Sequence, residues 1–148
     1  MSFIRTGLFI SFILIALQSS ATAQLFEDFE SGEKSSYSGA SITLTSGDWF
    51  LDDALIGSLS NDKYNGTRGV RMDRRDGKTG NIYMQFDKPN GADEVSFYLA
   101  HYGNNAEEAA LQVQYSLDGG DSWTNIGDEL SAPFDLTEDR KSTRLNSS

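Results

Sequence analysis

The chain has 148 residues and no cysteine, and its 22 acidic residues outnumber its 12 basic residues, for a net charge of −10. The lack of cysteine excludes a disulfide framework and a lipid-modified cysteine anchor. The acidic character disfavours binding to the phosphate backbone of nucleic acids and is compatible with cation binding and with solubility outside the cell.

The first segment, residues 1–23, has the organisation of a secretory signal peptide. Arg5 supplies a positive charge, the apolar run 7–17 is short for a bilayer span, and the small residues A-T-A at 21–23 form a cleavage site. An uncleaved membrane anchor is the alternative interpretation. We therefore expect a mature chain that begins at Gln24, is secreted or periplasmic, and has no membrane contact after cleavage.

Residues 24–138 alternate apolar and polar side chains over many short runs, the pattern of half-buried β-strands. Helical periodicity is limited to a short candidate around Glu107, and turns rich in glycine, asparagine and aspartate separate the runs. We predict an all-β fold, an antiparallel β-sandwich of the jelly-roll type. The expected strands are at 25–30, 41–45, 48–52, 69–73, 81–86, 94–102, 111–116 and 122–127.

Residues 116–123 read SLDGGDSW and match the S-x-D-x-G-x-x-W pattern of the Asp-box, which is best known from sialidases. A sialidase-like enzyme would be a propeller with several such boxes, an arginine cluster and a nucleophilic tyrosine, whereas this chain has one box and no internal repeat. Turn chemistry accounts for the motif residues Ser116, Asp118, Gly120 and Trp123. We therefore interpret the box as a structural β-hairpin with no catalytic residue.

Other candidate residues carry weaker signals. His101 is the only histidine, so a two-histidine relay and a histidine-rich metal site are excluded, and we expect it to be structural or solvent-facing. Tyr83, Tyr98 and Tyr102 lie on strand faces, where they either stack on sugar rings or simply cover the sheet. The charges at 71–78 are typical of a strand end and turn.

The final stretch, residues 139–148, reads DRKSTRLNSS and differs in character from the rest of the chain. The codons GAT CGG AAG AGC ACA CGT CTG AAC TCC AGT encode it and spell a common sequencing-library adapter, so we interpret it as a non-native tail from adapter read-through. A disordered basic tail that binds a partner is the alternative. We expect an incomplete, C-terminally truncated domain at 24–138, no regular structure at 139–148, and an open sheet edge at 25–30.

Four stretches follow one another in an order that resembles the N-terminal jelly-roll module of large secreted Bacteroidota proteins: LFEDFESGEKSSY (25–37), SGDWFLDDALIG (46–57), NDKYNGTRGVRM (61–72) and VQYSLDGGDSW (113–123). Such modules precede exported DNA/RNA non-specific endonuclease, adhesin or sorting domains. The Phe29-Glu30 pair also resembles the end of the first strand in cleaved-adhesin and MAM-type sandwiches. The endonuclease signature Asp-Arg-Gly-His is missing.

In such sandwiches the glutamate of this pair ligates a structural calcium ion together with an acidic residue from the last strand. The resemblance therefore implies that Glu30, with Asp28 or Glu27 nearby, holds structural Ca²⁺ in the intact domain. Hard carboxylate oxygens suit this ion, which takes six to eight oxygen ligands. A solvated acidic edge strand is the alternative.

These features predict a non-catalytic extracellular β-sandwich module that serves attachment, substrate targeting or domain spacing within a larger secreted bacterial protein. Its partner would be an extracellular carbohydrate or protein, with no nucleic acid bound by this domain and no cofactor apart from calcium. The alternative is the N-terminal region of an exported non-specific endonuclease whose catalytic domain is missing from this fragment.

Overall fold

The computed structural model describes residues 24–103 and 109–142, and it contains strands and one short 3₁₀ helix. All strand pairs in these residues are antiparallel, which confirms the all-β class and the antiparallel sandwich. The elements are β1 (Ala40–Leu44), β2 (Gly47–Asp52), β3 (Ala54–Gly57), β4 (Gly69–Met72), η1 (Arg75–Gly77), β5 (Asn81–Met84), β6 (Glu94–Leu99), β7 (Ala110–Leu111), β8 (Gln114–Tyr115), β9 (Thr124–Asn125), β10 (Leu130–Ser131) and β11 (Thr137–Ser142).

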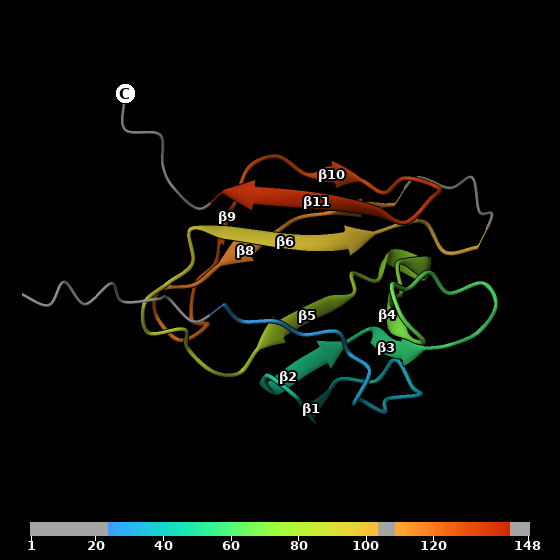
Figure 1. Cartoon of the computed structure of the whole chain (residues 1–148), viewed down its shortest axis with the longest axis horizontal. Coiled ribbons are helices and arrows are strands. Elements are labelled where there is room, and N and C mark those ends of the chain that lie inside the picture. Colours follow the sequence, from blue (N-terminus) through green and yellow to red (C-terminus); the bar gives the residue numbers. More distant parts are fainter. Residues whose placement is uncertain (1–23, 104–108, 143–148) are drawn as a thin grey trace, which may run out of the picture.

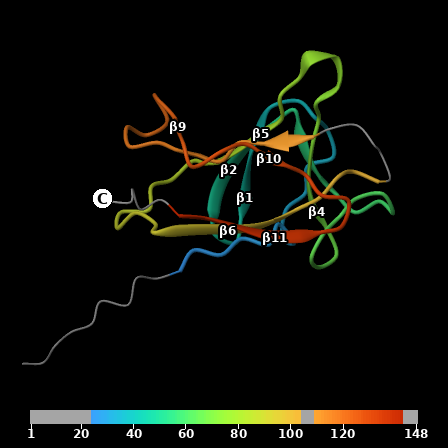
Figure 2. The same cartoon turned by 90° about the horizontal axis from the view of Figure 1, so that it is seen from above.

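The strands form one three-stranded sheet, in the order β1-β2-β5, and four two-stranded pairs, β3-β4, β6-β11, β7-β10 and β8-β9. Figure 2 shows β6 and β11 on one side of the molecule and β5, β9 and β10 on the other. The long β6-β11 pair runs along the longest axis, with the segment that begins at residue 24 beside it in both views (Figures 1 and 2). These two sides are the two layers of the sandwich.

The apolar core is small. Leu51 of β2 is the largest side chain with no exposed surface, and the other buried apolar side chains are Leu44, Ala54, Leu55 and Ile126. Alternation along β2 places Trp49 on the same side as Leu51. The Trp49 ring meets Phe29 and Phe86 edge-on, with centroids 5.5 and 6.4 Å apart. Aromatic edge contacts therefore extend this small core.

The predicted first strand, 25–30, is wrong, because these residues belong to no strand. The side chains of Glu27 and Asp28 accept the backbone N–H groups of Phe29 and Glu30, at 2.7 and 3.0 Å. Such local bonds compete with a sheet ladder, and Phe29 takes a left-handed φ of 62°. Phe26 is 72% exposed, but a segment that forms no strand has no sheet edge, so the expected open edge at 25–30 is wrong as well.

The expectation that 139–148 has no regular structure is wrong for 139–142, which belong to β11. Their backbone pairs with β6, in a register that sets Asp139 opposite Phe97 and Lys141 opposite Val95. Backbone hydrogen bonds do not depend on the side chains, so a polar segment can complete a ladder along an available strand edge. Residues 143–148 lie outside the described residues.

Three further differences concern strand prediction. β3 was missed because Ala54, Leu55 and Gly57 are all buried, so the strand has no apolar-polar alternation. The short strand β10 was also missed. The single strand predicted at 111–116 is divided into β7 and β8, and the Gln112 side chain bonds the backbone carbonyls of Val113 and Gly127 at the break.

Two expectations fall on residues that the structure leaves undescribed. The predicted signal peptide at 1–23 lies outside the described residues, and so does Glu107, at the centre of the helical candidate. Within the described ranges, no helix has the length and apolar character of a membrane span.

Candidate functional site

The Asp-box closes the β8-β9 hairpin through its own side chains. Ser116 Oγ accepts the N–H of Gly120 at 2.8 Å and donates to Asp118 Oδ1 at 2.7 Å. The Asp118 carboxylate also accepts the N–H and the hydroxyl of Ser122, at 2.9 and 2.5 Å. Gly119 and Gly120 have φ of 72° and 97°, which glycine adopts without steric strain. Each of these interactions orders the turn.

The hydrogen bonds of the box hold the pKa of Asp118 at about 2, below its ordinary 3.8, and the Ser122 hydroxyl contributes most. A folded-state pKa below the ordinary value means that the ionised carboxylate stabilises the fold above about pH 4. This contribution is lost as the pH falls towards 2.

Replacing Asp118 by alanine is expected to lower the melting temperature at neutral pH, because the N–H of Ser122 loses its acceptor. The difference from the parent chain should shrink as the pH falls below 4. Thermal unfolding followed by circular dichroism between pH 2 and 7 measures both effects. Asp121→Ala, which removes an exposed carboxylate in the same turn, is the control and should leave the melting temperature unchanged. Equal melting of the two variants would contradict the structural role of Asp118.

Trp123, the last residue of the box, joins the hairpin to the three-stranded sheet. Its ring lies 5.8 Å from Tyr83 of β5, and Tyr83 stacks on Phe50 of β2 at 5.2 Å. Trp123 remains 43% exposed. A row of three aromatic rings on the outer face of the sheet therefore anchors the hairpin. Tyr83 is the middle ring of this row and packs on both of the others.

The three candidate calcium ligands lie near one another in sequence but bind different parts of the backbone. Glu27 accepts both the N–H and the hydroxyl of Ser46, at 3.0 and 2.7 Å. Glu30 accepts the N–H of Thr67 at 2.8 Å and also its hydroxyl, and these bonds lower the pKa of Glu30. Asp28 accepts the N–H of Glu30.

These contacts tie the first segment to the β1-β2 turn and to the loop before β4. Among the residues that the structure describes, no three acidic, histidine or cysteine side chains gather closely enough to share a metal ion. Calcium binding by Glu27, Asp28 and Glu30 stays a prediction.

The remaining candidates from the sequence lie at or near β6. His101 is buried, and its ring stacks on Phe134 with centroids 5.1 Å apart. Tyr98 of β6 is 50% exposed and Tyr102, just beyond β6, is 41% exposed. These two tyrosines are accessible to a ligand in solution.

A cluster around Arg71 of β4 was not predicted from the sequence. The Arg71 guanidinium lies 4.8 Å from the ring centroid of Tyr102 and 5.8 Å from that of Tyr37. Arg71 Nη1 bonds Asp62 Oδ1 at 3.0 Å, and the Asp62 side chain is only 3% exposed. Arg71 Nε is buried without a hydrogen-bond partner. A cation thus lies against two aromatic rings, beside a buried carboxylate.

One feature of the sequence points to this cluster. Arg71 is a charged residue between the apolar residues Val70 and Met72 of a strand. A strand arginine at the register of the buried Leu55 needs a partner. That partner, Asp62, belongs to a loop and could not be assigned by strand pattern.

A second charged network forms the turn after β4. The buried Asp73 carboxylate accepts Arg75 Nε at 2.8 Å and lies 3.5 Å from Lys78 Nζ, and the Arg75 bonds hold the Asp73 pKa well below its usual range. Lys78 also pairs with Asp53 at 3.1 Å. This network accounts for the charges of Asp73, Arg75 and Lys78 as turn structure, as expected.

A comparison with family models, with curated proteins and with solved structures finds no match to this chain.

Proposed function

We propose that this chain is a non-catalytic, extracellular β-sandwich module that binds carbohydrate through Tyr102, and that it acts as an accessory part of a larger secreted bacterial protein. The observation that carries the proposal is the exposed Tyr102 ring supported by the Arg71 guanidinium, 4.8 Å from its centroid. An aromatic face held in place is suited to the apolar C–H face of a sugar ring.

The residues before and after Tyr102 are both fixed by backbone hydrogen bonds. The N–H of His101 donates to Pro133 O at 2.7 Å, and the N–H of Gly103 donates to Asn61 O at 2.8 Å. A ligand that stacks on this ring therefore meets a preorganised surface and loses less free energy to ordering it.

A polar side chain lies beside Gly103, the residue that follows Tyr102. The Asn61 side chain lies close to Gly103, where an added Cβ would be 3.5 Å from Asn61 Cγ. An amide offers both a donor and an acceptor, as sugar hydroxyls require. The combination of a stacking ring and an adjacent amide supports carbohydrate as the ligand class.

Affinity electrophoresis in gels that contain soluble xylan, laminarin or galactomannan tests the proposal. The full chain should be retarded by at least one polymer, and Tyr102→Ala should remove the retardation because the stacking surface, worth about 0.5–1.5 kcal/mol beyond its buried area, is lost. Tyr102→Phe should retain it.

Tyr98→Ala is the matched control, since Tyr98 of β6 is 50% exposed, against 41% for Tyr102, and is not one of the two rings on which Arg71 lies. Retardation that Tyr102→Ala leaves intact, or no retardation by any of the three polymers, would contradict the proposal.

A further inference from the structure

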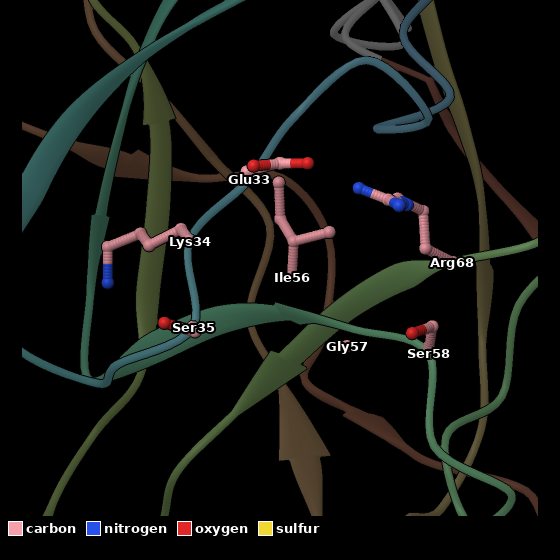
Figure 3. Close-up of a pocket in the computed structure, with 7 residues that line it drawn as sticks. All are labelled: Glu33, Lys34, Ser35, Ile56, Gly57, Ser58 and Arg68. Carbon is pink, nitrogen blue, oxygen red and sulfur yellow. The ribbon is translucent and has the colours of Figure 1, made fainter.

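A second feature that could receive a ligand lies on the other face of the β3-β4 pair. It is a pocket of about 380 Å³, within the volume range of small-molecule sites. Its walls come from the segment 33–35, the end of β3 with Ser58, and Arg68. Figure 3 shows Ile56 between Glu33 and Arg68, with Ser58 at the border.

Opposite charges face one another across this pocket. The Glu33 carboxylate extends over Ile56 towards the Arg68 guanidinium (Figure 3), yet no ion pair joins these two described residues. Arg68 Nη1 donates to Gly32 O at 2.7 Å, and the other guanidinium N–H groups have no acceptor within the described ranges. The Glu33 carboxylate on one wall can therefore accept hydrogen bonds from a ligand, and the Arg68 guanidinium on the other wall can donate them.

The lysine that lines the same pocket plays no part in this arrangement. The Lys34 ammonium points away from the pocket in Figure 3 and donates to the carbonyls of Ala54 and Ser36, both at 2.6 Å. Its burial lowers its pKa. The charges offered to a ligand are therefore those of Glu33 and Arg68.

The walls are held by contacts outside the pocket. Glu30 accepts the N–H groups of Thr67 and Arg68, at 2.8 and 3.3 Å, and the N–H of Ile56 donates to Lys34 O at 2.9 Å. The wall segments are thereby fixed to one another and to β3, so the pocket is formed before any ligand binds.

We propose that this pocket binds a neutral sugar ring with vicinal hydroxyl groups. Each hydroxyl is both a donor and an acceptor, so one donates to Glu33 while its neighbour accepts from Arg68. The C–H face of the ring packs on Ile56, and the hydroxyls of Ser35 and Ser58 meet the rim of the ring.

This site is separate from Tyr102. In the β3-β4 register, Ile56 is opposite Val70 and Leu55 is opposite Arg71, so Ile56 and Arg71 point to opposite faces of the pair. The pocket proposal rests on Glu33, Ile56 and Arg68, and a failure of binding at Tyr102 leaves it standing.

The test uses amide chemical shifts of the full chain during titration with glucose, galactose and mannose. At least one sugar should produce saturable shifts at 33–35, 56–58 and 68. Glu33→Ala should weaken that binding by about tenfold or more, because a charge-assisted hydrogen bond is lost. Glu33 is exposed and makes no described hydrogen bond, so this variant keeps the fold.

Glu129→Ala is the matched control: it removes an exposed glutamate outside the pocket and should bind like the parent chain. Raising the salt concentration should leave the affinity for a neutral sugar unchanged. The proposal is overturned if none of the three sugars gives saturable shifts at these residues, or if Glu33→Ala binds as tightly as Glu129→Ala.

Discussion

Leu51→Ala is expected to lower the free energy of unfolding by about 2–5 kcal/mol, the usual cost of emptying a buried leucine site. Leu51 has no exposed surface and lies between Ala40 of β1 and Ile82 of β5 in the central strand of the sheet. The surrounding core is small, so few neighbours can move to fill the cavity. A loss of this size is a large part of an ordinary margin of about 5–15 kcal/mol.

Equilibrium unfolding in urea measures this change as a shift of the midpoint at constant slope. Leu117→Ala is the control, because the same atoms are removed from a side chain that is 90% exposed. A loss for Leu51→Ala as small as that of the control would show that the two layers do not close over β2.

Arg71→Ala is expected to cost about 3–5 kcal/mol, because it leaves the carboxylate of Asp62 buried without its cation. The Asp62 side chain is 3% exposed and also accepts the N–H of Leu59 at 2.8 Å. The substitution also removes the guanidinium that lies over Tyr37 and Tyr102. Thermal and urea unfolding should both report the loss.

Arg140→Ala tests whether burial is the cause. Arg140 pairs with Glu94 and Glu138 at 3.4 and 2.9 Å, but its side chain is 62% exposed, and surface ion pairs contribute at most about 1 kcal/mol. The loss of stability for Arg71→Lys should be smaller than that for Arg71→Ala and larger than that for Arg140→Ala. Lysine keeps the charge but lacks the planar group that stacks on the tyrosines. Equal costs for Arg71→Ala and Arg140→Ala would contradict a buried ion pair at β4.

The features that could be predicted from the residues are those whose interactions are local. The pairing of β1 with β2 follows from alternation across a tight turn, and the Asp-box hairpin follows from Ser116, Asp118 and the two glycines, all within one loop. The hydrogen bonds of such a turn depend mostly on the residue types within it, so a known motif is enough to predict them.

Which distant segments meet depends on the packing of the whole chain and could not be predicted from the residues. β11 pairs with β6 although its side chains carry no strand pattern, because pairing depends on backbone groups and on an available edge. The segment 25–30 carries an apolar pattern and still forms no strand, since its acidic side chains bond nearby and distant backbone N–H groups instead. The Arg71 cluster and the Glu33–Arg68 pocket arise where separate loops converge, and the positions of loops depend on the packing of the whole chain rather than on the residues of any one of them.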